Sequence, residues 1–139
     1  MDPWHNRRVN RVIAPSTIAA TAARYAHAVV STAPTKILHS SGIVPISIDG
    51  SVPETLAEQA AVVWSNLLAI LSEAQMSVDD IVSITTYVVH REGLEQDLGV
   101  VMAARDRALD GHLAASTLVT VPALARDAWL MEIALVAVS

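Results

Sequence analysis

One carboxylate stands inside an otherwise apolar segment near the end of the chain. Glu132 lies within residues 130–135 (Leu-Met-Glu-Ile-Ala-Leu), a run whose composition predicts a buried strand. A buried carboxylate without a partner is unfavourable in free energy, so Glu132 needs hydrogen-bond donors or a proton. It is therefore either a structural hydrogen-bond acceptor or a general acid/base in a cleft, and the sequence favours neither.

Hydroxyl and imidazole groups recur two residues apart in two further segments. His39 and Ser41 alternate along one predicted strand, so their side chains share a face, and Tyr25 and His27 do the same on the strand before it. A histidine, a tyrosine and a serine on one sheet face could serve proton transfer. The same residues also suit a polar rim or an interface, and for His27 that structural role is the better prediction.

The sequence lacks the motifs that hold cofactors. Its five glycines do not cluster as a phosphate-binding loop requires, and its five histidines show no spacing typical of a metal site. The chain has no cysteine, which excludes thiol nucleophiles and disulfides. We therefore expect neither a metal nor an organic cofactor.

Hydrophobic periodicity predicts the elements that would position these side chains. Apolar residues three and four apart predict a helix over residues 53–75 and a second over 92–109. Strands are expected in the other apolar segments, at 9–13, 25–32, 36–41, 81–90, 116–121 and 129–138. The turn at Pro34 predicts a hairpin between the second and third strands, and the last two strands are expected to form another.

This order of elements predicts an α+β fold, a mixed sheet with two helices on one face. The last strand is apolar at nearly every position, which is typical of a strand covered on both faces. Hydrophobic residues make up 53% of the 139 residues and charged residues 17%, and the mean hydropathy is +0.43. So apolar a chain is expected to bury surface against other subunits. We expect a single domain, residues 9–139, after an N-terminal arm, residues 1–8.

Charge and hydropathy restrict the partners. The sequence has nine basic residues, only one of them a lysine, and fourteen acidic residues, which gives a net charge of -5. A nucleic-acid partner is therefore not expected. No apolar run approaches the roughly 20 residues of a membrane span. The prediction is a cytoplasmic protein with a small-molecule substrate and no membrane partner.

Several short segments together resemble the Rid family (reactive intermediate deaminase, also called YjgF). They are residues 24–29 (Arg-Tyr-Ala-His-Ala-Val), 38–45 (Leu-His-Ser-Ser-Gly-Ile-Val-Pro), 49–53, 57–60, 66–71, 80–88, 116–119 and 131–133. Each segment is short, and as a set they extend over residues 9–138.

The resemblance implies a chorismate-mutase-like fold of the bacillus type. It also implies a homotrimer whose sheets form a central barrel, with clefts between subunits. Family deaminases hydrolyse 2-imino or 2-enamino acids to 2-keto acids and ammonia without a cofactor. On the matching positions, Tyr25 would be the cleft tyrosine, Ser41 and Gly42 the Ser-Gly turn whose amide assists, and Glu132 the carboxylate that positions water, with His39 as a further catalytic candidate.

The chain departs from the family pattern where substrate is expected to bind. The family's Pro-Ala-Arg-Ser/Thr motif appears as residues 114–117 (Ala-Ala-Ser-Thr), so Ser116, or Ala115 under a one-residue shift, replaces the arginine. Met102 stands in place of an asparagine and Ile43 in place of a glutamine. A serine cannot supply the bidentate, charged contact that arginine makes with a carboxylate. With Gly42, these residues and Leu118 are the expected substrate-binding set.

Two functions remain open at this point. The first is a divergent Rid-type enzyme acting on a small imine, enamine or carbonyl compound that is less acidic and more apolar than 2-iminopropanoate. The second is a non-catalytic trimer that binds a small metabolite or a protein partner. A ribonuclease activity, sometimes assigned to relatives, fits poorly with the net charge of -5.

Overall fold

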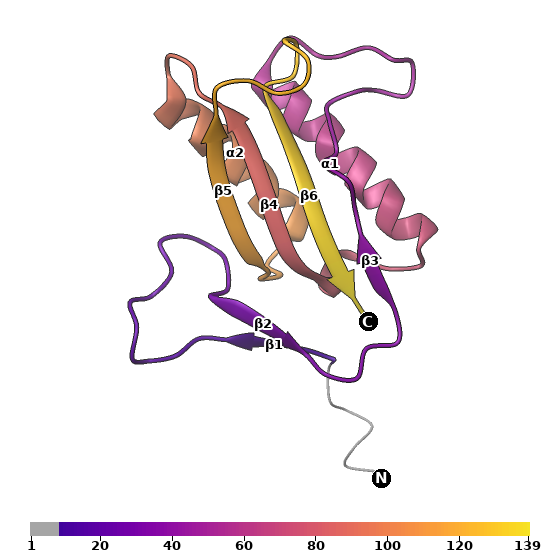
Figure 1. Cartoon of the computed structure of the whole chain (residues 1–139), viewed down its shortest axis with the longest axis vertical. Helices are drawn as coiled ribbons and strands as arrows, with labels where there is room; N and C mark the ends of the chain where they lie inside the picture. Colours follow the sequence, from indigo (N-terminus) through magenta and orange to yellow (C-terminus); the bar gives the residue numbers. More distant parts are fainter. Residues whose placement is uncertain (1–8) are drawn as a thin grey trace.

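Two helices cover one face of a four-stranded sheet in the computed structural model, which describes residues 9–139 (Figure 1). The predicted N-terminal arm, residues 1–8, lies outside the described residues. In chain order the elements are β1 (Asn10–Ile13), β2 (Ala28–Ser31), β3 (Ile37–His39), α1 (Leu56–Glu73), the 3-10 helix η1 (Val78–Asp80), β4 (Ile81–Val89), α2 (Leu94–Leu109), β5 (Ala115–Val121) and β6 (Met131–Val138). Neither α-helix is long and apolar enough to cross a membrane.

The strand order of the main sheet is β3-β6-β4-β5, and β1 and β2 form a separate two-stranded sheet. Strand β6 runs antiparallel to both of its neighbours, whereas β4 and β5 are parallel. Parallel neighbours need a crossover connection, and α2 supplies it. The sheet is therefore mixed, as predicted, and β6 is an internal strand.

Both predicted hairpins are wrong. Strand β2 pairs with β1, while β3 pairs with β6 in the other sheet. Strands β5 and β6 are not neighbours, because β4 lies between them. The segment that joins β5 to β6, residues 122–130, is long enough to pass the end of β4. Strand β6 therefore gains a partner along each edge instead of lying at the rim of the sheet.

Helix α1 begins where its cap allows. Thr55 has extended backbone angles and its hydroxyl accepts the amide of Glu58 at 3.3 Å, so the predicted start at Pro53 falls two residues before the cap. Gln75 adopts a left-handed conformation, with φ of 57°, just beyond the helix end. The apolar stripe faces the sheet, and its first four members are fully buried: Leu56, Ala60, Val63 and Leu67.

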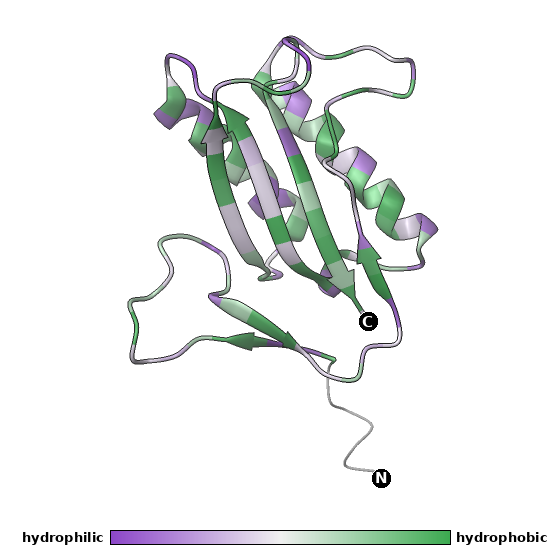
Figure 2. Cartoon of the chain, viewed as in Figure 1, coloured by the Kyte–Doolittle hydropathy of each residue, from purple (hydrophilic) through white to green (hydrophobic). Residues whose placement is uncertain are grey.

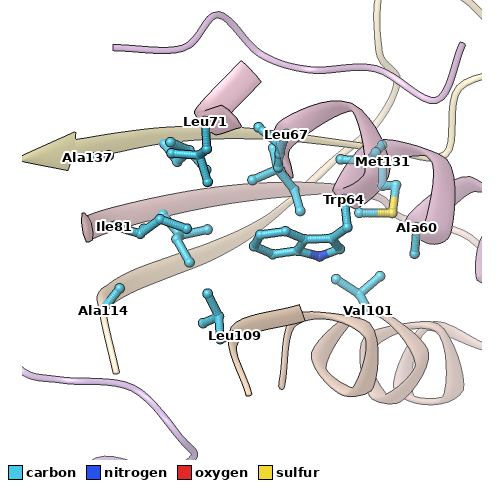
Figure 3. Packing of buried hydrophobic residues seen from close by; sticks show 14 of the residues in the cluster. Ala60, Trp64, Leu67, Leu71, Ile81, Val101, Leu109, Ala114, Met131 and Ala137 are labelled. Carbon is cyan, nitrogen blue, oxygen red and sulfur yellow. The ribbon is translucent and has the colours of Figure 1, made fainter. Parts of the chain in front are cut away.

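The core lies between the helices and one face of the sheet. Trp64 of α1 is 4% exposed and lies among Leu67, Val101 and Met131 (Figure 3). Alternate residues of β6 reach this core, starting with Met131 and Ile133, and on β4 Ile84 does the same. Figure 2 shows β6 as apolar over most of its length, with a hydrophilic position near its start.

No helix within residues 9–139 lies over the opposite face of the sheet, which we call the open face (Figure 1). Alternation along each strand assigns the residues to it. They are Ile37 and His39 on β3; Glu132, Ala134, Val136 and Val138 on β6; Ser83, Thr85, Tyr87 and Val89 on β4; and Ala115, Thr117, Val119 and Val121 on β5. Ile37 is 54% exposed and Val119 38%, so this face presents apolar surface.

Candidate functional site

The carboxylate of Glu132 lies directly over Gly42. A Cβ built on Gly42 would lie 3.0 Å from Cδ of Glu132 and would overlap its Oε1 atom. Gly42 does not have a positive φ, so its backbone angles do not require glycine. Glycine here leaves space for the carboxylate, because a Cβ would displace the Glu132 side chain from this position.

A bulge in the pairing of β3 with β6 brings Gly42 to this position. The Ser40 amide donates to the carbonyl of Leu135 at 3.0 Å, and the next ladder contact joins Ile43 to Ile133 at 2.7 Å. From Ser40 to Ile43 the chain advances three residues, whereas β6 advances two, from Leu135 to Ile133. This bulge leaves Ser41 and Gly42 outside the ladder of hydrogen bonds. Both residues are exposed.

The side chain of Ser40 holds the bulge in shape. Its hydroxyl accepts the amide of Leu135 at 2.9 Å and donates to the carbonyl of Ser41 at 2.8 Å. One side chain thus takes the place of the missing ladder acceptor and fixes the following peptide. Sequence reasoning missed Ser40, because nothing in the pattern distinguishes it from Ser41.

The amide of Gly42 is available to a ligand. Within residues 9–139 no carbonyl or side chain accepts a hydrogen bond from it. A backbone N–H that has no internal partner and lies beside a carboxylate can stabilise negative charge developing on a bound oxygen or nitrogen. The pair thus combines a proton acceptor with a fixed donor.

Tyr87 is the cross-strand partner of Glu132. The two residues are directly opposite in the antiparallel register of β4 and β6, and both are half-buried on the open face. Their Cβ atoms are therefore about 4.5–5.5 Å apart. Sequence reasoning missed Tyr87, since its alternation was visible but the register that places it beside Glu132 was not.

A buried glutamine fixes the start of β6. Gln59 of α1 is 1% exposed and donates to the carbonyls of Pro53 and Ala128, both at 2.8 Å. Its Oε1 accepts the amide of Leu130 at 2.9 Å. These bonds tie the helix to the segment two residues before Glu132, so the backbone that carries the carboxylate is firmly anchored.

The other predicted catalytic residues lie at the far end of the sheet. Ala26 pairs with Ala115 at the start of β5, which places Tyr25 there, and His39 lies opposite Val136 on the open face. Glu132 is four residues farther along the strands, about 13 Å. In the case of Tyr25, three strand spacings of about 4.8 Å add to this separation. One chain therefore keeps Ser41, Gly42 and Glu132 together and Tyr25 and His39 apart from them.

Four of the predicted substrate-binding residues do not lie on the open face. Leu118 and Ile43 pack against the core, and Met102 is half-buried on α2. Ser116 also faces the helices, where Nη1 of Arg105 donates to its hydroxyl at 3.4 Å. Ala115, by contrast, is on the open face.

Two hollows lie away from Glu132. The first, about 90 Å³, is on the open face and includes His39, Ser83 and Thr85 in its lining. The second, about 220 Å³, is lined by Arg24 and by residues around the end of α2. In residues 9–139 no three His, Asp or Glu side chains group in a way that could hold a metal ion.

Fold and site together define an α+β domain of the chorismate-mutase-like type, with a carboxylate and a free amide at one end of an open sheet face. The family model described as endoribonuclease L-PSP matches residues 16–139, and the chain belongs to this family, which includes the Rid (YjgF) proteins. The resemblance noted in the sequence is thereby confirmed.

Solved structures agree with this assignment. YyfB of Yersinia pestis, a Rid-family protein of unknown function, is 28% identical, with 95% of this chain and 100% of that chain covered and a TM-score of 0.84. The YjgF gene product of E. coli is also 28% identical, with coverages of 92% and 98% and a TM-score of 0.66. YyfA of Y. pestis is 25% identical, with coverages of 94% and 99% and a TM-score of 0.68. No curated protein matches the chain.

Proposed function

We propose that the chain is a divergent Rid-family enzyme that hydrolyses a small imine or enamine, or acts on a related carbonyl compound, without a cofactor. The observation that carries the proposal is the contact between the Glu132 carboxylate and Gly42, whose amide has no acceptor within residues 9–139. A general base beside a fixed hydrogen-bond donor is the minimum that addition of water to a C=N bond requires.

Each proton has a place in this reaction. Glu132 removes a proton from water as the water oxygen bonds to the imine carbon, and the electron pair of the C=N bond moves to nitrogen. The protonated Glu132 then returns the proton to that nitrogen. The Glu132 carboxylate then takes the proton of the new hydroxyl and delivers it to the nitrogen as the C–N bond breaks, which leaves a carbonyl compound and ammonia. Ser41 and the Gly42 amide hydrogen-bond the substrate during these steps.

The charges around the site favour a substrate without a carboxylate. None of the open-face residues is an arginine or lysine, and Ala115, which matches the family's arginine under a one-residue shift, carries no charge. Arg105 is on the other side of the sheet, bonded to Ser116 and Asp106. Arg126 lies 5.8 Å from the ring centre of Trp129, a cation–π arrangement that occupies it. An anionic substrate would meet Glu132 without a compensating cation.

The separation of the predicted residues supports a site shared between copies. Tyr25 cannot reach Glu132 within one chain, given about 13 Å along the strands and three strand spacings across. The open face is apolar enough to be buried, with Ile37 54% exposed. We therefore include in the proposal a homotrimer in which Tyr25 of a second copy completes the site of the first.

A non-catalytic trimer that binds a small metabolite is the second candidate. The observation in its favour is Ser116, which faces Arg105 inside the protein and has no access to a ligand on the open face. A binding protein could keep the Gly42 amide as a ligand contact and use Glu132 only as an acceptor. RNA cleavage, which the family name suggests, is not favoured, because the net charge is -5 and phosphate binding needs basic clusters.

The experiment is a hydrolysis assay with imines made in situ. An amino-acid oxidase acting on alanine gives a charged imine, and an amine oxidase acting on a simple alkylamine gives a neutral one. We expect faster release of ammonia from the neutral imine in the presence of the protein. Acceleration of neither imine, together with saturable binding of a neutral carbonyl compound, would instead support the non-catalytic trimer.

A further inference from the structure

The open face carries a second polar side chain beside the proposed reacting group. Tyr87 is directly opposite Glu132 across β4 and β6, and Gly42 lies on the other side of the carboxylate. Glu132 is thus flanked by the Gly42 backbone and by the phenol ring. None of the hydrogen bonds within residues 9–139 involves the hydroxyl of Tyr87, which is half-buried.

The surroundings of this pair are poor in other donors. The next open-face residue on β6 is Ala134, the next on β4 toward the strand end is Val89, and Val119 is the neighbour of Tyr87 on β5. The next hydroxyls on the strands are those of Thr85, paired with Ala134, and of Thr117, paired with Thr85, and Ser41 carries another beside Gly42. Among the open-face residues of the strands, Tyr87 is therefore the hydroxyl donor directly beside Glu132.

The geometry of the two side chains assigns the donor its target. A tyrosine hydroxyl extends farther from its backbone than a glutamate carboxylate, so from adjacent positions it reaches past the carboxylate to what is bound above it. A phenol is neutral near pH 7 and donates one hydrogen bond. It suits the nitrogen or oxygen acceptor of an uncharged substrate and offers no charge to a carboxylate.

We propose that Tyr87 is a substrate-binding residue of this site, and that its hydroxyl and the Gly42 amide together hold the acceptor atom of a neutral imine or carbonyl compound over Glu132. The inference rests on the proposed function and adds the residue that selects an uncharged substrate. It also gives one chain its own tyrosine at the site, in addition to Tyr25 of a second copy.

The chain has only two tyrosines, which makes a direct test practical. Protein labelled with 13C at the tyrosine Cζ gives two resonances, and the variants Tyr25→Phe and Tyr87→Phe assign them. The probe is pyruvamide, a neutral carbonyl compound, and pyruvate is its charged counterpart. Calorimetry on the same samples measures binding. Thr85→Val is the matched control, because it removes a hydroxyl from the same face two residues before Tyr87 on β4.

We expect pyruvamide to move the Tyr87 resonance saturably and pyruvate to move it less. Tyr87→Phe should weaken pyruvamide binding about 5- to 10-fold, the scale of one lost neutral hydrogen bond, while Thr85→Val leaves binding within about 2-fold. If calorimetry detects binding of pyruvamide but the Tyr87 resonance does not shift, or if Tyr87→Phe binds pyruvamide with wild-type affinity, the inference is wrong while the proposed function still stands. No binding of pyruvamide at all would count against both the inference and the proposed substrate class. A Tyr87 response in a protein whose Glu132→Gln variant keeps full turnover would overturn the proposed chemistry and leave the inference standing.

Discussion

Gly42 and Glu132 fit together so closely that any side chain at position 42 would occupy the space of the Glu132 carboxylate. The contact joins two segments that are 90 residues apart in the sequence, 132 minus 42, and the bulge after β3 creates it. The Glu132 carboxylate thus lies against the Gly42 backbone and next to an amide that has no acceptor within residues 9–139, an arrangement that suits binding of a ligand.

Replacement of Gly42 by alanine should separate activity from stability. The obstructing Oε1 atom is the end of a flexible side chain, which can rotate away at small cost, so we expect the free energy of unfolding to fall by less than about 1 kcal/mol. The displaced carboxylate should lower turnover about 100-fold or more.

The control for that variant is Gly99→Ala. Gly99 is in α2, is exposed, and has no atom within 4 Å of the place where a Cβ would be. Alanine there should raise stability by about 0.5–1 kcal/mol through helix propensity and leave turnover unchanged. Turnover of Gly42→Ala equal to that of Gly99→Ala would show that the Gly42–Glu132 contact has no role in the reaction.

Ser40 should matter to stability far more than its neighbour. Ser40→Ala removes the acceptor of the Leu135 amide, and an unsatisfied amide at this buried position costs about 1–3 kcal/mol. Ser41→Ala removes an exposed hydroxyl and should change the free energy of unfolding by no more than about 0.5 kcal/mol. Urea unfolding of the two variants decides this, and equal values would mean that the Ser40 hydroxyl does not hold the bulge.

An arginine returned to β5 should restore carboxylate binding at one position only. Ala115 is on the open face, whereas Ser116 faces the buried Arg105, which is 6% exposed. Ala115 lies at the Tyr25 end of this face, about 13 Å along the strands from Glu132, so an arginine there would serve the site of a second copy, as Tyr25 does in the proposed trimer. Ala115→Arg should therefore raise hydrolysis of 2-iminopropanoate by the trimer about 10-fold or more through a charge-assisted contact. Ser116→Arg should not raise it and should lower the melting temperature, because it places two like charges inside the protein. Gain of activity in the second variant and none in the first would contradict the assignment of faces.

The oligomeric state is a separate test of the shared site. The apolar open face predicts a homotrimer at micromolar concentration, measured by sedimentation or mass photometry. Thr117→Asp and Val119→Asp place charges on this face and should shift the population to monomer. If the wild-type protein is a stable monomer, no second copy is present, and Tyr25 cannot be part of the proposed site.

Local pattern was enough to predict the elements but not their pairing. Both helices were predicted within about three residues of their observed bounds, because the spacing of their apolar residues is a property of the segment itself. The hairpins were wrong because neighbouring strands in the sequence were assumed to be neighbours in the sheet. The apolar composition of β6 is typical of an internal strand, and an internal strand pairs with a neighbour along each edge.

The same limit applies to the site. Glu132 could be predicted because a charge inside an apolar strand is conspicuous, and Gly42 because of the family resemblance. Tyr87 could not, since its closeness to Glu132 depends on the register of two strands that are 42 residues or more apart in the sequence, 131 minus 89. The side chain of Gln59 looked like any polar residue on a helix, and only the packed structure shows its three bonds to backbone.

The most direct test of the central claim is the Glu132→Gln variant, with assembly, stability and turnover measured on one preparation. Glutamine keeps the shape of glutamate but cannot exchange a proton. For Glu132→Gln we expect the wild-type oligomeric state, a melting temperature within a few degrees of wild type, and turnover of the neutral imine reduced about 100-fold or more. Full turnover in a folded, assembled Glu132→Gln protein would contradict this expectation, and would leave Glu132 as a structural hydrogen-bond acceptor.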